Sequence, residues 1–408
     1  MLHGFRCSTS IAMPFTGRKR KHRYLQTPRF FRIFRRNTMA AVSQGNKVEL
    51  LGHGDAFFTA LLGAFAKARD YIHLEFYMIR DDATGRLFAD TLINAASRGV
   101  QVLLIYDYIG SFDTPAAFFR RLQDGGVHCL PFNPPSFRRG IAWFDKRDHR
   151  KMAVIDGKSA FMGGINIGDE YAGSGECTEK WRDLGMRIDG PSAADLEKLF
   201  RSNWREEKSK SPLHWRPDPI PVDAGGEAEV MIVNGGPHHN RSLIRSAFRL
   251  AIAGATDSVR VVNPYFVPGP RVVRSLLRAA ARGVEVQLIL PSRSDVPVVR
   301  LVGRSYYAPL LKAGIEISEL EGAVLHAKVM LIDDSWAVIG SANLDQRSFH
   351  RNYEVNAIVN SRDFGIQVKE MFATDLARSR RVIFEEHERR GPLTRLMERL
   401  CAPISWFL

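Results

Sequence analysis

Two segments of the chain carry the same polar residues at the same spacing. The segments are DHRKMAVIDGKSAFMGGIN, which begins at Asp148, and LHAKVMLIDDSWAVIGSANLD, which begins at Leu325. In each segment a lysine follows a histidine by two positions, an aspartate by seven, a glycine by fourteen and an asparagine by seventeen. One such pattern could arise by chance, but two copies with identical offsets indicate two related half-sites in one chain.

The repeated residues are mostly cations and hydrogen-bond donors, which suit a tetrahedral anion such as phosphate. The candidate catalytic residues are His149, Lys151, Asp156, His326, Lys328 and Asp333. Gly164 and Ser341 are small enough for a substrate to approach the backbone, and Asn166 and Asn343 supply amide donors. These four residues are therefore candidates for binding the phosphate of a substrate.

Each copy of the pattern supplies only one histidine, whereas covalent catalysis at phosphorus needs two. One imidazole would attack phosphorus, and the other would protonate the leaving alcohol and then deprotonate the incoming one. We therefore expect the two halves to face each other. A nucleophilic histidine is usually held in one tautomer by a carboxylate, and Asp183 and Glu354, which follow the two motifs, are candidates for this role. No carboxylate cluster or HxH spacing predicts a metal site, and no cofactor is expected.

The elements around the motifs also recur. Residues 55–126 alternate helical and strand patterns, and the same order returns after residue 240, with ASRGVQVLLI matched by AARGVEVQLI. This alternation predicts an α/β fold, with a parallel-type sheet between helices in an α-β-α sandwich. We expect a first α/β domain over residues 46–206, a Pro- and Gly-rich linker over 207–227 and a second α/β domain over 228–380, with a shared active site at their interface.

The net charge of +14 is concentrated near the N-terminus. Ten of the 58 basic residues lie in residues 1–38, which contain no acid, so the rest of the chain is nearly neutral. Residues 1–45 are expected to form a basic arm that is disordered or a gene-model extension. Such an arm could attract anionic lipid or nucleic acid. The four scattered cysteines favour a reducing compartment, and neither a transmembrane helix nor a secretory signal is predicted.

Two further stretches could contact lipid. The loop FNPPSFRRGIAWF over residues 132–144 mixes aromatic residues with arginines, and it forms either a wall of a lipid entrance or an ordinary packed loop. The tail over 381–408 is expected to be amphipathic and to lie at a membrane interface, or else to pack on the core. Its apolar face would consist of Leu393, Leu396, Met397, Leu400 and Ile404.

The motifs resemble those of the phospholipase D superfamily, whose signature is HxKx4D followed by GSxN. The first copy departs from it, with Gly164 at the serine position. Over about residues 46–365 the chain is similar to bacterial cardiolipin synthases of the type lacking N-terminal transmembrane helices. The stretches LEFYMIRDDATGRLFADTL, AARGVEVQLILPSRSDVPVVR and GSANLDQRSF carry this resemblance.

The resemblance implies two phospholipase D-like domains and phosphatidyl transfer from phosphatidylglycerol, or a related lipid, through a phosphohistidine to the hydroxyl of another phosphatidylglycerol. It implies phospholipid substrates and an anionic membrane surface as partners, with peripheral attachment to the cytoplasmic side of the bacterial inner membrane. A hydrolytic phospholipase D would have the same site. A nuclease of the superfamily is disfavoured, because the nearly neutral body does not predict a basic groove for nucleic acid. Neither the oligomeric state nor the identity of the nucleophilic histidine follows from the sequence.

Overall fold

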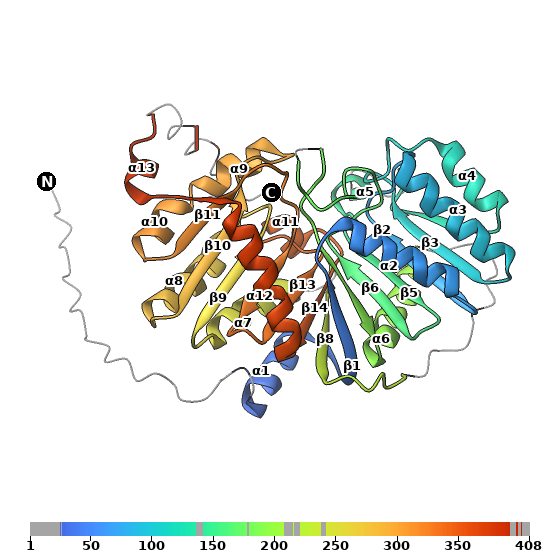
Figure 1. Cartoon of the computed structure of the whole chain (residues 1–408), viewed down its shortest axis with the longest axis horizontal. Helices are drawn as coiled ribbons and strands as arrows, with labels where there is room; N and C mark the ends of the chain where they lie inside the picture. Colours follow the sequence, from blue (N-terminus) through green and yellow to red (C-terminus); the bar gives the residue numbers. More distant parts are fainter. Residues whose placement is uncertain are drawn as a thin grey trace, which may run out of the picture.

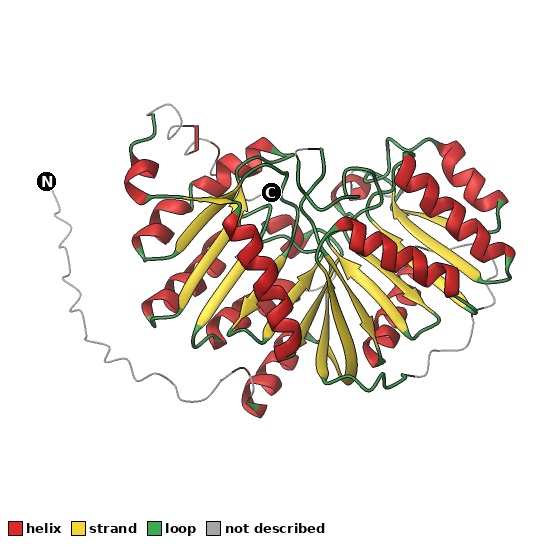
Figure 2. Cartoon of the chain, viewed as in Figure 1, coloured by secondary structure: helices red, strands yellow, loops and turns green. Residues whose placement is uncertain are grey.

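The two halves of the chain build one continuous sheet, seen in this computed structural model as a fan of strands between helices (Figure 2). The structure describes residues 25, 27–135, 142–177, 179–207, 215, 221–237, 242–391, 397–398 and 401. The strands of the first half are β1 (Ala41–Leu51), β2 (Tyr71–Phe76), β3 (Gln101–Asp107), β4 (His128–Phe132), β5 (Lys151–Ile155), β6 (Ser159–Gly163) and β7 (Gly185–Asp189). Those of the second half are β8 (Ala228–Gly235), β9 (Ser258–Val262), β10 (Glu285–Pro291), β11 (Glu316–Leu320), β12 (Val329–Ile332), β13 (Trp336–Gly340), β14 (Glu354–Asn360) and β15 (Ser379–Arg381).

The order of the strands shows the duplication directly. Across the sheet it is β15-β11-β10-β9-β12-β13-β14-β8-β1-β7-β6-β5-β2-β3-β4, and β8 and β1 pair antiparallel at the centre. Starting from this pair, both halves run outward in the same sequence, which confirms the predicted duplication. The expected parallel sheet is only partly correct, because β2-β3-β4 and β9-β10-β11 are parallel but the motif strands are antiparallel. Each motif forms a hairpin, and a short turn can join only antiparallel strands.

Helices cover both faces of the sheet (Figure 1). They are α1 (Pro28–Thr38), α2 (Gly54–Lys67), α3 (Ala83–Ser97), α4 (Ala116–Asp124), α5 (Ala142–Asp145), α6 (Pro191–Glu206), α7 (Leu243–Gly254), α8 (Gly269–Ala281), α9 (Pro297–Arg304), α10 (Tyr307–Lys312), α11 (Gln346–His350), α12 (Arg362–Ala377) and α13 (Phe384–Glu388). Among the described residues, none of these helices has the length and apolar character needed to cross a bilayer.

The two halves are packed together rather than tethered. One buried hydrophobic cluster contains Met162 and Ile188 of the first half together with Ile339 and Val355 of the second. The helix α12 of the second half packs on β1 of the first, where the Gln367 side chain accepts a hydrogen bond from the backbone of β1. Burial of a shared apolar cluster therefore fixes the two motif hairpins relative to each other.

The N-terminal region differs from the expected disordered arm from Pro28 onward. The helix α1 begins with Thr27 as its N-cap, and Phe30 and Phe34 on one side of it are buried. Their rings pack edge-on against the buried Trp336, with centroids 5.5 and 5.8 Å away. The strand β1 follows within three residues and pairs with both halves of the sheet. Residues 28–45 thus belong to the fold, because the phenylalanine spacing supplies a buried face that the charge count conceals.

Several expected segments fall largely outside the described residues. The loop over 132–144 is described only up to residue 135 and from residue 142, and most of the tail beyond Gly391 is not described, including Leu393, Leu396, Leu400 and Ile404. In the region expected to be the linker, α6 ends at Glu206 and β8 begins at Ala228.

Candidate active site

The histidine of each motif is placed by the opposite half of the molecule. His149 precedes β5, and its backbone N–H donates to the carbonyl of Tyr353 in the second half at 2.9 Å. His326 precedes β12, and its N–H donates to the carbonyl of Arg182 in the first half at 2.8 Å. These short bridges lie beside the two candidate carboxylates, since Tyr353 precedes Glu354 and Arg182 precedes Asp183. The backbone pairing therefore brings each imidazole to a carboxylate of the other half.

The resulting contacts are crossed between the halves. His149 Nδ1 lies 3.0 and 3.1 Å from the two carboxylate oxygens of Glu354, and His326 Nδ1 lies 2.6 Å from Asp183 Oδ2. Both carboxylates are buried. With Nδ1–H donated to a carboxylate, the lone pair of each imidazole is on Nε2. The structure thus brings Asp183 and Glu354 to the histidines in the geometry that a tautomer-fixing carboxylate requires.

Burial sets the charge of the two imidazoles. It lowers the pKa of His149 to about 4, although Glu354 acts in the opposite direction. It also lowers the pKa of His326, and the neighbouring Lys328 ammonium adds to this effect. Both rings are therefore neutral near pH 7, and a neutral imidazole is the form that can act as nucleophile or base.

The two motif lysines contact the backbone of the histidines. Lys151 Nζ donates to the backbone carbonyl of His149 at 2.7 Å, and Lys328 Nζ donates to the carbonyl of His326. Both side chains are buried, and burial lowers the pKa of Lys151 to about 7 and also lowers that of Lys328. Both amino groups are held against the backbone of the histidine in the same motif, and their lowered pKa values mean that a nearby anion favours their charged form.

The motif aspartates do not reach the pocket. The carboxylate of Asp156 accepts backbone hydrogen bonds from residues 69–71, and that of Asp333 accepts them from residues 256–258. Both residues have positive φ, 51° and 48°, in the hairpin turn after the motif strand. The structure therefore corrects the expected catalytic role of these two residues: they fasten the turn of each motif hairpin to the start of the neighbouring strand.

The small residues of the motifs also serve the carboxylates rather than the cavity. A Cβ at Gly164 would lie 2.2 Å from Asp183 Oδ1, so only glycine leaves room for this carboxylate. At the matching position in the second half, the Ser341 hydroxyl donates to Glu354. The expected phosphate-binding role of Gly164 and Ser341 is thus replaced by a positioning role.

The two histidines and the two motif asparagines line one cavity of about 410 Å³. The Asn166 amide is already engaged, since it accepts from the N–H of Met78 at 3.2 Å and donates to the Tyr171 hydroxyl at 2.8 Å. The Asn343 side-chain oxygen is buried and has no partner among the described residues. The structure therefore brings together residues 177 positions apart in sequence, and Asn343 retains a free hydrogen-bonding group for a ligand.

Sequence reasoning missed most of the remaining cavity wall. Its charged residues include Arg80, Arg147, Glu170, Asp295, Asp345 and Arg347, and its aromatic residues include Tyr77, Tyr171, Trp181 and Tyr265. Asp345 is buried, and burial raises its pKa to about 7. Asp345 is the last residue of the second motif segment and Arg347 follows it by two positions, so their position was the available signal. The others come from several separate loops and carry no local pattern. Among the described residues, no group of three potential metal ligands is present.

Comparisons with known proteins agree with this architecture. The sequence matches the family described as "Cardiolipin synthase, PLD-like domain" over residues 61–204 and 249–376. Cardiolipin synthase 2 of Bacillus cereus is 34% identical over 393 residues, which span 95% of this chain and 75% of the relative. Cardiolipin synthase A of Pseudomonas putida is 36% identical over 365 residues, which span 88% of this chain and 74% of the relative.

A solved structure supports the fold. The phosphatidylserine synthase of Haemophilus influenzae superimposes with a TM-score of 0.70 over 93% of this chain and 100% of its own, at 13% sequence identity. At this identity the likeness concerns the fold alone, an α/β structure with two phospholipase D-like segments.

Proposed function

The chain belongs to the family of phospholipase D-like cardiolipin synthases, and on this basis we propose how its two-histidine cavity carries out phosphatidyl transfer. The enzyme is a phosphatidyltransferase that acts on phospholipids. We propose phosphatidylglycerol, or a related phospholipid, as donor and a second phosphatidylglycerol as acceptor. The products would then be cardiolipin and the small alcohol released from the donor.

In the first step, Nε2 of one histidine attacks the phosphorus of the donor lipid. A P–N bond forms and the P–O bond to the headgroup alcohol breaks. The negative charge of the bound phosphodiester raises the pKa of the other imidazole, so this ring takes up a proton at Nε2 and gives it to the leaving oxygen. The carboxylate on Nδ1 of the attacking ring, Glu354 for His149 or Asp183 for His326, stabilises the positive charge that develops on that ring.

In the second step, the headgroup hydroxyl of the acceptor lipid replaces the departed alcohol. The second imidazole, now neutral, removes its proton, the hydroxyl oxygen attacks phosphorus and the P–N bond breaks. Because the second imidazole regains in this step the proton that it gave in the first, and the nucleophilic ring is released, each turnover restores the starting enzyme. The charges of Lys151 and Lys328 lie close enough to the cavity to offset the negative charge on the nonbridging oxygens.

The single observation that carries this mechanism is the pair of imidazoles in one cavity, each held at Nδ1 by a buried carboxylate of the opposite half. One imidazole with a carboxylate could support hydrolysis of many esters. Two of them, each held at Nδ1 so that Nε2 is the reacting nitrogen, supply both the nucleophile and the acid–base group of a two-step transfer.

We also propose that the enzyme attaches peripherally to the cytoplasmic side of the bacterial inner membrane. Its phospholipid substrates reside in a bilayer, and an anionic bilayer surface would attract the basic N-terminal residues of the chain.

The test is the lipid product formed from phosphatidylglycerol in mixed detergent micelles, identified by mass spectrometry. Wild type is expected to form cardiolipin, and His149→Asn and His326→Asn are each expected to lower the rate by at least about 10³-fold. His128→Asn, at an exposed position outside the cavity, is the matched control and should keep the wild-type rate. Phosphatidic acid as the sole product would show that the enzyme is a hydrolase and not a synthase. Cleavage of nucleic acid without lipid turnover would refute both activities.

A further inference from the structure

Three neighbouring helices, α1, α7 and α8, carry arginines and no acidic residue. Their sequences are PRFFRIFRRNT, LIRSAFRLAIAG and GPRVVRSLLRAAA. The helix α7 packs against both α1 and α8, so the three helices are neighbours (Figure 1). We call the arginines of α7 and α8 the arginine face. Arg249, Arg271, Arg274 and Arg278 are exposed, and none of the four has a carboxylate partner within the described part of the chain.

The duplication provides an internal comparison for this face. The helices α2 and α3 occupy the equivalent places in the first half, with sequences GDAFFTALLGAFAK and ATGRLFADTLINAAS. Each contains one base and one acid. When the matching segments ASRGVQVLLI and AARGVEVQLI are aligned, Arg274 corresponds to Asp90 and Arg278 to Asn94. The fold therefore forms without arginines at these positions, so their concentration on α7 and α8 needs another explanation.

The arginines of this face are close enough to repel one another. Burial lowers the pKa of Arg245, and the nearby Arg271 and Arg249 lower it further. Arg249, Arg278 and Arg282 also line a groove of about 280 Å³ between α1, α7 and α8, together with Ser246 and Ser275. A concave surface with several guanidinium groups and no acid favours phosphate groups, which accept hydrogen bonds from arginine in a bidentate geometry.

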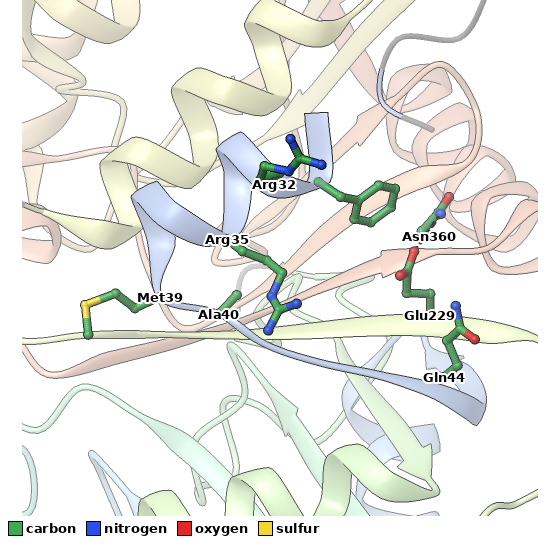
Figure 3. Close-up of a pocket in the computed structure, with 8 residues that line it drawn as sticks. Arg32, Arg35, Met39, Ala40, Gln44, Glu229 and Asn360 are labelled. Carbon is green, nitrogen blue, oxygen red and sulfur yellow. Dashed lines mark hydrogen bonds between the residues drawn. The ribbon is translucent and has the colours of Figure 1, made fainter. Parts of the chain in front are cut away.

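The opposite side of α1 has a different character. Figure 3 shows Arg32 and Arg35 on α1 beside a second groove, whose wall includes Glu229 and Asn360. Glu229 accepts a hydrogen bond from the Asn360 amide at 3.1 Å. The acid in this groove makes its charge mixed, so the uniformly basic surface is the one formed with α7 and α8.

The arginine face approaches the rim of the catalytic cavity at the start of α7, whereas its groove lies toward the end of that helix, beside Leu250 and Ala253. On the single helix α11, Arg347 lines the cavity and His350 lies 2.7 Å from the guanidinium of Arg245 on α7. A phospholipid headgroup held near the start of α7 is therefore about one helical turn from the cavity wall.

We propose that the arginine face is the surface on which the enzyme docks to a bilayer containing anionic phospholipid. The occupant is a lipid surface rather than a soluble anion, because the proposed donor and acceptor are themselves anionic lipids that must travel from a bilayer to the adjoining cavity. This step rests on the proposed function. The guanidinium groups contact headgroup phosphates, and the docked orientation places α11 next to the lipid surface.

The test uses two full-length double variants that lose the same charge. The first carries Arg274→Gln and Arg278→Gln, and the control carries Arg120→Gln and Lys198→Gln. The control residues are exposed on α4 and α6 of the first half. Binding is measured by co-sedimentation with vesicles of phosphatidylcholine alone or with phosphatidylglycerol added. Each arginine near an anionic surface contributes about fivefold, so the first variant should bind phosphatidylglycerol vesicles roughly 25-fold more weakly, and the control should bind like wild type.

Several outcomes would overturn the proposal: equal binding by the first variant and wild type, an equal loss in the control, or equal binding of wild type to neutral vesicles. Wild-type binding to duplex DNA but not to anionic vesicles would assign the face to nucleic acid. Cardiolipin formation in mixed micelles, where no bilayer is needed, is measured in parallel. It should be unchanged in the first variant, and its absence in wild type would refute the proposed function independently of the docking result.

Discussion

Replacing Glu354 with glutamine removes one negative charge from the pocket and almost nothing else. The carboxylate of Glu354 is buried and accepts hydrogen bonds from His149 Nδ1, from the Ser341 hydroxyl and from the Asn352 amide at 3.2 Å. Although burial raises its pKa, the contacts with His149, Lys151 and Ser341 lower it overall, so the group is a carboxylate at neutral pH. The variant therefore exchanges a charged acceptor for a neutral amide of the same shape.

Two effects set the size of the loss. A hydrogen bond to a charged group contributes about 1.5–3 kcal/mol, which corresponds to roughly 10- to 150-fold in rate if the imidazolium forms only in the transition state. The amide NH2 can also donate to His149 Nδ1, which moves the ring proton to Nε2 and blocks both attack and proton abstraction. In a Ser-His-Asp triad this exchange lowers kcat by about 10⁴. We therefore expect kcat of Glu354→Gln to fall by about 10² to 10⁴, with little change in KM.

The assay is steady-state formation of cardiolipin from phosphatidylglycerol in mixed micelles. Glu229→Gln, which makes the same chemical change at a carboxylate outside the catalytic cavity, is the control and should retain the wild-type kcat. If Glu354→Gln keeps its kcat within about threefold of wild type, the carboxylate does not act on the ring proton, and the crossed His149–Glu354 pair has no catalytic role.

The remaining predictions follow from the reassigned motif residues, the N-terminal helix and the buried histidines. Asp333→Asn should keep kcat within a few-fold of wild type and lower the free energy of unfolding by about 1–3 kcal/mol, because asparagine tolerates positive φ but weakens the backbone hydrogen bonds. A 10²-fold loss of kcat at unchanged stability would indicate that Asp333 is catalytic after all. Gly164→Ser should lower kcat at least tenfold by displacing Asp183, whereas Ser341→Gly should lower it by only about fivefold through one lost hydrogen bond. Equal losses of kcat in the two variants would contradict the conclusion that a side chain at position 164 displaces Asp183. Phe34→Ala should reduce the free energy of unfolding by about 3–5 kcal/mol in denaturant titrations, since α1 is part of the core. An unchanged denaturation midpoint would show that α1 does not pack on the core. Because the pKa of His149 is lowered to about 4, the unfolded chain binds more protons than the folded one between about pH 4 and 6.5. The free energy of unfolding should therefore decrease as pH falls through this window, and it should decrease less in His149→Asn. Identical pH profiles of the two proteins would contradict the assigned shift.

The repeated spacing made the duplication, the α/β class and the paired histidines predictable, because residue offsets within a hairpin are a local property. The crossing of the carboxylates was not predictable. His149 and Glu354 are 205 residues apart, and His326 and Asp183 are 143 apart. They meet only because short backbone bridges join the halves beside each histidine. Such pairing depends on the docked arrangement of two halves, which no local pattern encodes.

Other misassignments have simple physical reasons. A seven-residue offset places Asp333 near His326 in sequence, but the intervening strand carries its carboxylate to the far end of the hairpin. Residues 28–38 contain four arginines and no acid, so composition indicated a solvated arm, while Phe30 and Phe34 provided a buried stripe at helical spacing. The near-neutral average of the body similarly concealed the arginine face, because charge is distributed unequally between equivalent helices of the two halves.

The most direct test of two histidines sharing one site is to trap the covalent intermediate. A donor such as phosphatidyl-p-nitrophenol needs no proton on its leaving group, so the nucleophilic histidine can attack it without help from the acid–base histidine. The later transfer to the acceptor still needs the acid–base histidine. Intact-protein mass spectrometry should therefore find an acid-labile phosphatidyl adduct accumulating in one of His149→Asn and His326→Asn, carried by the remaining histidine of the pair, and no adduct in the other variant. An adduct on any other residue, or its absence from both variants while wild type turns over, would contradict the mechanism.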